Sequence, residues 1–224
     1  MKSIIVIGLG RFGLQLAKSL SSQNRKDIIA IDIEEEMVQK ASEFLEHCYI
    51  CDATNMSALK ELGVSNVDEA IVAIGEDLEA SILTVSNLKT LGVEKIIVRA
   101  DQIEHVDIFT RLGATEVVVP EISAGETLAN KLISDSFLDY YKVQGEYGIV
   151  RISVEITTPT PALKELNTPT EYKVSIVSIL RGKEIIIPTG DDNIQPGDVV
   201  FVIGKTKYIM TFEHALKEWE INEE

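Results

Sequence analysis

The sequence predicts an α/β fold, in which a Rossmann-like, doubly wound parallel sheet is followed by a small α+β C-terminal domain. Residues 1 to about 120 alternate between short apolar runs with strand character and longer helical stretches. A glycine-rich loop follows the first run directly, and strands separated by turn signals dominate from Gly148 onward. Short apolar strands joined by helices form parallel sheets that are covered on both faces, so the first part is expected to be doubly wound.

The first part of the chain contains six strand candidates, each followed by a helical pattern. The strand candidates are Ser3–Gly8, Ile28–Asp32, His47–Cys51, Ala70–Gly75, Lys95–Arg99 and Thr115–Val119. The helix candidates between them are Gly13–Ser22, Glu35–Phe44, Met56–Leu62, Leu78–Leu91 and Ile103–Leu112. Three of these helices are followed by Gly63, Gly92 or Gly113, and glycine is the usual residue after a helix C-terminus.

The pattern changes after Pro120. Residues Ser123 to Glu126 fit a capping box and predict a helix that runs towards Leu138. The stretch DYYKVQGEYG is then interpreted as a connector, which divides the chain into residues 1–135, a linker over 136–147 and a C-terminal domain over 148–224. The last domain is expected to contain the strands Ile149–Ile156, Lys173–Leu180, Glu184–Ile187 and Asp198–Ile203. A short helix is expected in TPTPALKEL and a final one over Lys205–Trp219.

Composition indicates an ordinary globular protein of 224 residues, with 45% hydrophobic and 25% charged residues. The net charge of −15 argues against nucleic acid as a partner, because phosphate-backbone binding needs a basic surface. No apolar run approaches the roughly 18–20 residues of a membrane span. Glycines interrupt the apolar N-terminal stretch, and no small-residue cleavage site follows it. We therefore expect a cytoplasmic protein that meets any membrane partner from outside the bilayer.

The two cysteines, Cys48 and Cys51, form a C-x-x-C spacing beside His47. This spacing is found in redox pairs and in zinc sites, but a zinc site usually needs a second ligand pair, and none is within reach in the sequence. The segment also reads as a strand, in which positions i and i+3 point to opposite faces. Metal or redox chemistry is therefore not expected here.

The glycine-rich loop is Gly8-Leu9-Gly10-Arg11-Phe12-Gly13. The G-x-G-x-x-G spacing becomes informative when a strand precedes it, a helix follows it and an acidic residue comes about 20 positions later. Asp32 ends the second strand candidate and fits that acidic position, where a carboxylate accepts both ribose hydroxyls of an adenosine and repels a 2′-phosphate. The alternative is that Asp32 only caps the next helix.

Ligands of open parallel sheets bind outside the carboxyl ends of the strands. The residues at those ends are Asp52 and Ala53, Ile74 and Gly75, and Arg99. Asp52 is placed to receive an adenine amino group. Arg11 and Arg99 place two cations near the same end of the sheet. Two positive charges suit a terminal phosphate better than an uncharged nicotinamide riboside. A surface ion pair of Arg11 with Glu76 or Asp77 is an equally supported alternative.

Two function classes stay open on the residues alone. One is a ligand-gated regulatory module, and the other is an NAD-dependent dehydrogenase of unknown substrate. A dehydrogenase needs an acid–base residue beside the nicotinamide and a substrate pocket from a second domain. The only histidines are His47, His105 and His214. Two of these fall in a strand and in the last helix, and the second domain is small, so we expect no enzymatic activity.

Several segments together resemble one known family. They are IIVIGLGRFGLQLAKSL, IAIDI, CDATN, EAIVAIGED, KIIVRAD and LGATEVVVPE, followed by YKVSIVSILRGKEIIIPTGDDNIQPGDVVFVIG. The chain resembles the RCK (regulator of K+ conductance) family, and more closely the Ktr/Trk-type cytosolic regulatory subunits of potassium uptake systems. The resemblance covers almost the whole chain.

This resemblance implies a homodimer that assembles into a ring, expected to be an octamer, on the cytoplasmic face of a membrane potassium-translocating subunit. Exchange of ATP and ADP, with NAD or NADH as further ligands, would reshape the ring. The nucleotide would lie on Gly8 to Gly13, Asp32, Asp52, Ala53, Ile74 and Gly75, with polar contacts from Arg99 and His105. Arg11 resembles the arginine that senses the terminal phosphate. Glu121 matches an acidic residue that can hold a divalent cation, although a carboxylate also suits a helix N-terminus by itself.

Some members of this family bind cyclic di-AMP in the C-terminal domain, where an arginine-containing stretch follows the ELN motif. Here the motif continues as Leu166-Asn167-Thr168-Pro169-Thr170 without an arginine. That departure argues against cyclic di-AMP as a ligand of this chain, although the arginine is not required in all relatives.

Overall fold

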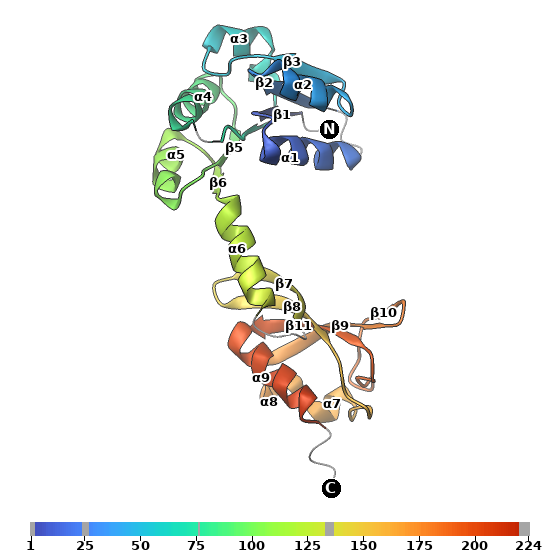
Figure 1. Ribbon diagram of the computed structural model, residues 1–224. Helices are drawn as coiled ribbons and strands as arrows, with labels where there is room; N and C mark the ends of the chain where they lie inside the picture. Colours follow the sequence, from blue (N-terminus) through green and yellow to red (C-terminus); the bar gives the residue numbers. More distant parts are fainter. Residues whose placement is uncertain (1–2, 24–26, 76, 133–136, 220–224) are drawn as a thin grey trace. The chain divides into compact units, whose positions relative to one another are not determined.

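The computed structural model describes residues 3–23, 27–75, 77–132 and 137–219. The chain divides into two compact units, Met1–Ile122 and Ser123–Glu224 (Figure 1). Unit 1 contains the predicted parallel sheet and unit 2 contains a smaller antiparallel sheet.

The sheet of unit 1 is parallel throughout, with the strand order β3-β2-β1-β4-β5-β6. Its strands are β1 (Ile4–Ile7), β2 (Ile28–Asp32), β3 (His47–Ile50), β4 (Glu69–Val72), β5 (Lys95–Arg99) and β6 (Glu116–Val118). The chain moves outward in one direction from β1 to β3 and then crosses back to β4, which confirms the doubly wound fold. The crossover places a topological switch point between β1 and β4, where ligands of such sheets bind.

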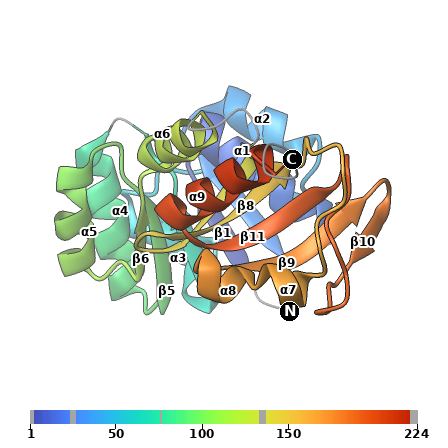
Figure 2. The same ribbon diagram turned by 90° about the horizontal axis from the view of Figure 1, so that it is seen from below.

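Helices cover both faces of this sheet. Helices α1 (Arg11–Ser22) and α2 (Glu35–Ser42) bury residues such as Ala17 and Val38 against β1 and β2. The other face packs against α3 (Met56–Glu61), α4 (Leu78–Thr90) and α5 (Val106–Leu112), and the last two of these lie side by side (Figures 1 and 2). Two short 3-10 helices, η1 (Val64–Asn66) and η2 (Ile103–His105), precede β4 and α5.

The two cysteines lie on opposite sides of the sheet, as the strand spacing predicts. Cys48 packs against the core beneath α1 and α2, and Cys51 packs against the core on the other face. Burial raises the pKa of both thiols, and the nearby Asp52 carboxylate raises that of Cys51 further. Among the described residues, no group of three or more histidine, cysteine or acidic side chains could hold a metal ion.

The predicted helix start at Ser123 is wrong, because α6 extends over Pro120–Lys131. Proline suits the first position of a helix, where its fixed φ is already helical and its missing N–H has no intrahelical partner. Ser123 therefore lies one turn inside the helix instead of capping it. Leu138 belongs to the next strand, and residues 133–136 between them lie outside the described part of the chain.

The predicted linker over 136–147 is also wrong, since β7 (Phe137–Gln144) occupies most of it. Phe137 and Tyr140 are buried in the core of unit 2, and β7 pairs antiparallel with β8 (Tyr147–Ser153). Gly145, with φ 55°, forms the hairpin turn between the two strands. The connector interpretation failed because the strand lacks a clean alternation: Leu138, Tyr141 and Val143 are exposed, and the pairing register shifts between Phe137 and Asp139.

Unit 2 is an antiparallel sheet with the order β10-β9-β11-β8-β7. Its other strands are β9 (Val174–Arg181), β10 (Glu184–Ile186) and β11 (Val199–Lys205). Helix α9 (Thr206–Lys217) lies across β8 and β11 and buries Phe212 against them (Figure 2). The expected short helix is present as α7 (Leu163–Leu166), and a second one, α8 (Thr168–Glu171), follows it.

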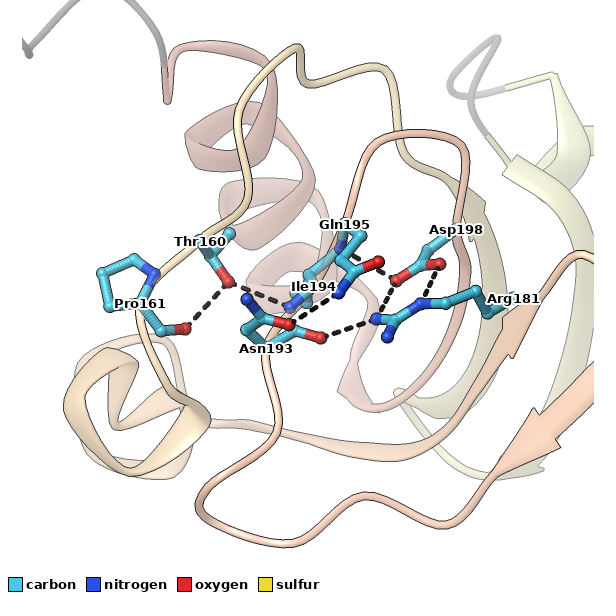
Figure 3. Close-up of polar contacts among 7 residues, drawn as sticks. All are labelled: Thr160, Pro161, Arg181, Asn193, Ile194, Gln195 and Asp198. Atoms are coloured by element: carbon cyan, nitrogen blue, oxygen red, sulfur yellow. Dashed lines mark hydrogen bonds and ion pairs between the residues drawn. The ribbon is translucent and has the colours of Figure 1, made fainter.

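A buried ion pair fixes the loop before β11 (Figure 3). Arg181 donates hydrogen bonds to both carboxylate oxygens of Asp198, which is 1% exposed, and to the main-chain oxygen of Asn193. The Gln195 N–H also donates to Asp198, and the Thr160 hydroxyl accepts a bond from the Ile194 N–H. Among the described residues, the partners of the Asp198 carboxylate come from unit 2, so we assign this network a structural role.

Candidate functional site

A cavity of about 500 Å³ lies at the carboxyl ends of β1, β2, β4 and β5, at the switch point of the sheet. Nine of the predicted site residues line it. They are Gly8, Gly10, Phe12, Asp32, Asp52, Ala53, Ile74, Gly75 and Arg99. Strand ends that are far apart in the sequence thus meet around one cavity, as the parallel topology requires.

The three glycines of the loop play different roles. A Cβ atom on Gly8, which has φ +91°, would lie 2.9 Å from the backbone of Ala73, and one on Gly13 would lie 1.9 Å from the carbonyl oxygen of Gly8. These two glycines therefore allow the strand, the turn and α1 to pack closely. A Cβ on Gly10 would meet no atom within 4 Å, so this residue leaves open space where a ligand can approach the backbone.

Helix α1 begins directly beside this open space. Gly10 is its N-cap residue and offers no capping side chain. The helix N-terminus therefore faces the cavity mouth with main-chain N–H groups and the positive end of its dipole, which favours an anion.

The other loop residues do not line the cavity. Leu9 is fully buried, and Arg11 is exposed at the first position of α1. The structure shows no ion pair for Arg11 among the described residues. Asp77, one of its two predicted alternatives, caps α4 by accepting the Ala80 N–H, and Glu76 lies outside the described residues.

The Asp32 carboxylate contacts two main-chain N–H groups, and its expected contact with ribose stays a prediction. One carboxylate oxygen accepts the N–H of Leu9 in the glycine loop, and the other accepts the N–H of Glu34, the N-cap residue of α2, at 2.8 Å. Each carboxylate oxygen has a second lone pair, so Asp32 can still accept hydroxyl groups from a ligand in the cavity. The contact with Leu9 also fixes the loop relative to β2.

Asp52 follows β3 and forms a local turn. Its Oδ1 atom accepts the main-chain N–H of Thr54 at 2.9 Å and the Thr54 hydroxyl at 2.7 Å. The adjacent Ala53 is held from the other side, because its carbonyl oxygen accepts a hydrogen bond from Asn87 on α4. Asp52 therefore lines the cavity from a turn that hydrogen bonds hold in place.

Arg99, the last residue of β5, places its guanidinium against the cavity wall. It lies 5.9 Å from the centroid of the Phe12 ring, and a Cβ on Gly75 would come within 3.2 Å of its Nη1 atom. Its Nη2 atom forms an ion pair of 2.7 Å with Glu121 in the first turn of α6. The Glu121 main-chain N–H and the Arg99 guanidinium hold the pKa of the Glu121 carboxyl below its usual value of 4.5.

Two predicted residues are held away from the cavity wall. The Nδ1 atom of His105 lies 2.8 Å from a carboxylate oxygen of Asp101, and His105 does not line the cavity. Glu121 contacts Arg99 and lies outside the wall as well. Their proposed contacts with nucleotide and cation stay predictions.

Sequence reasoning missed part of the cavity wall. The residues that line it without having been predicted include Ile33, Glu34, Met37, Cys51, Thr54 and Ala80. Ile33, Glu34 and Met37 come from the β2–α2 segment, directly after Asp32. Their position shortly after Asp32 was the only signal in the sequence. A side chain at the start of a helix shows no sequence pattern that predicts a cavity beside it.

The sequence matches two known family models and several known proteins. The family model of the TrkA-N domain matches residues 4–120, and that of the TrkA-C domain matches residues 160–217. The chain is 38% identical over 213 residues to the Ktr system potassium uptake protein C of Bacillus subtilis (strain 168), with 95% of this chain and 96% of that protein covered.

Two solved structures share its fold. A GsuK channel bound to NAD superposes with a TM-score of 0.64 at 15% identity, covering 99% of this chain and 40% of the channel chain. A GsuK structure bound to ADP gives a TM-score of 0.50 at 28% identity, covering 58% of this chain and 34% of that one. Within the described residues of our protein, no helix has the length and apolar character needed to span a bilayer.

Proposed function

The chain belongs to the family of proteins with TrkA-N and TrkA-C domains, which includes the Ktr potassium uptake protein, and on this premise we propose that it is the nucleotide-sensing regulatory subunit of a potassium uptake system. The observation that carries this proposal is the cavity at the switch point, where an open glycine, an uncapped helix N-terminus, Asp32 and Arg99 meet. These groups match the phosphates and the ribose of a nucleotide.

Adenine nucleotides that end in a phosphate, ATP and ADP, are the favoured ligands. Arg99 borders the cavity, and Arg11 occupies the first turn of α1, where the helix dipole disfavours a cation unless an anion compensates it. GsuK structures are bound to ADP in one case and to NAD in another, so the preference for ATP and ADP rests on the two arginines. NAD and NADH fit the same glycine loop and the same ribose acceptor. Their nicotinamide riboside, however, would offer Arg11 and Arg99 no terminal phosphate.

A regulatory role is favoured over a dehydrogenase. Of the three histidines, none is among the residues that line the cavity within the described part of the chain. Hydride transfer would need a proton donor beside the nicotinamide. Binding energy that shifts the protein between two conformations needs no such donor, only different affinities for the two states.

The proposal includes a homodimer that builds a ring on the cytoplasmic face of a membrane potassium-translocating subunit. The end of helix α6 supports self-association, because Leu128 and Leu132, which follows one turn later, are 58% and 77% exposed. Exposed apolar side chains on one helix favour a protein partner. The mass of the assembly in solution, measured by light scattering, tests the dimer and the ring.

Direct binding measurements test the proposed ligand. Calorimetric titration of the purified protein with ATP, ADP, NAD and NADH is expected to give tighter binding of ATP and ADP. Tight binding of NADH without binding of ATP or ADP would refute the nucleotide-sensing role in this form, and hydride transfer to a carbonyl substrate would revive the dehydrogenase.

A further inference from the structure

Arg99 is shared between the cavity and the start of α6. Arg99 lines the cavity, yet its Nη2 atom forms an ion pair of 2.7 Å with Glu121. The Arg99 side chain is 19% exposed, whereas that of Glu121 is 60% exposed. The pair therefore joins a largely buried cation at the site to a carboxylate on the surface.

The bonding of Arg99 is incomplete in this arrangement. Its Nε atom is buried and has no hydrogen-bond partner among the described residues. A buried donor without a partner is costly, and a guanidinium is built for two parallel bonds to a carboxylate or a phosphate. Glu121 supplies one such bond, so a phosphate that reaches Arg99 from the cavity can improve on it.

Arg99 lines the cavity together with Gly75 and Phe12. Gly75 has no side chain where it faces Nη1, and the Phe12 ring supports the guanidinium. We propose that Glu121 and the terminal phosphate of the bound nucleotide compete for Arg99. A ligand must then carry enough negative charge on its phosphate to displace the Glu121 carboxylate. This inference rests on the proposed nucleotide site and gives Glu121 a specificity role there.

The competition also provides a link from the site to α6. Glu121 is the second residue of α6, directly after Pro120. Once released from Arg99, its carboxylate stays favoured by the helix N-terminus and becomes available to a divalent cation. Ligand binding thus changes the bonding of the first turn of the helix that continues into unit 2.

The test compares Glu121→Gln with Glu126→Gln, a carboxylate on the same helix whose ion-pair partner is Lys142. Affinities for ATP, ADP and adenosine are measured by calorimetry in EDTA, which removes divalent cations. We expect Glu121→Gln to bind ATP and ADP about threefold to tenfold more tightly, because a neutral amide holds Arg99 less strongly than the carboxylate does. Adenosine has no phosphate to compete for Arg99, so its affinity should not change, and Glu126→Gln should match the wild type throughout.

A double variant checks that the effect passes through Arg99. In an Arg99→Gln background, adding Glu121→Gln should leave the ATP and ADP affinities unchanged. Wild-type affinities in Glu121→Gln, or a loss that occurs only when Mg²⁺ is present, would overturn the competition and leave Glu121 as a cation ligand alone. Absence of ATP and ADP binding to the wild type would instead refute the nucleotide site itself.

Discussion

At the scale of single residues, Arg11 carries the clearest sign of function. It is an exposed cation at the positive end of a helix, and a residue that served only the surface would be better placed elsewhere. We expect Arg11→Ala to weaken ATP binding by about 1–3 kcal/mol, the range for a lost charge-assisted contact, and to affect ADP and NADH less. Lys18→Ala, on an exposed position of the same helix, is the control in calorimetric titrations. Equal losses for all three ligands would show that Arg11 does not contact the terminal phosphate.

The two cysteines provide an internal reporter of occupancy. Cys51 lines the cavity, whereas Cys48 packs on the other face of the sheet. Because the pKa of both thiols is raised above the usual 9.0, alkylation by iodoacetamide should be slow at neutral pH and accelerate in alkaline solution. Saturating ADP should slow the alkylation of Cys51 in Cys48→Ser and leave that of Cys48 in Cys51→Ser unchanged, as followed by mass spectrometry. Equal protection of both thiols would indicate global stabilisation instead of a ligand beside Cys51.

At the scale of elements, the turn between β1 and α1 contains one glycine that packing requires and another that leaves space for a ligand. Gly13→Ala places a methyl group against the Gly8 carbonyl and should cost at least about 1–3 kcal/mol of stability. Gly10→Ala meets no atom and keeps a φ of −62° that alanine adopts easily, so its melting temperature should stay close to the wild type. Its ADP affinity should fall, because the methyl group fills the ligand's approach. Circular dichroism and calorimetry measure the two effects, and a Gly10→Ala protein that binds ADP normally would remove this loop from the site.

At the scale of the whole molecule, all cavity residues belong to unit 1. ADP at 100 times its Kd should therefore stabilise that unit by about 2.7 kcal/mol and raise its melting transition in scanning calorimetry. Asp32→Ala is expected to remove this shift, since the ribose loses its acceptor. A shift that persists in Asp32→Ala would exclude this residue from the ribose site.

The sequence determined the order of the strands and helices of unit 1, the glycine loop and half of the residues that line the cavity. Hydrophobic periodicity and glycine spacing are local signals, and the parallel topology then brings the strand ends together. Asp32, Asp52 and Arg99 were found in this way and line one cavity.

Only the tertiary structure decided which distant residues become partners. The segment expected to be a linker is strand β7, because Phe137 and Tyr140 pack in the core of unit 2. No pattern within the segment itself predicts that core. The tertiary structure also paired Arg99 with Glu121, which lie on separate elements. Long-range contacts of this kind depend on how the strands and helices pack, and a single sequence carries no local pattern for them.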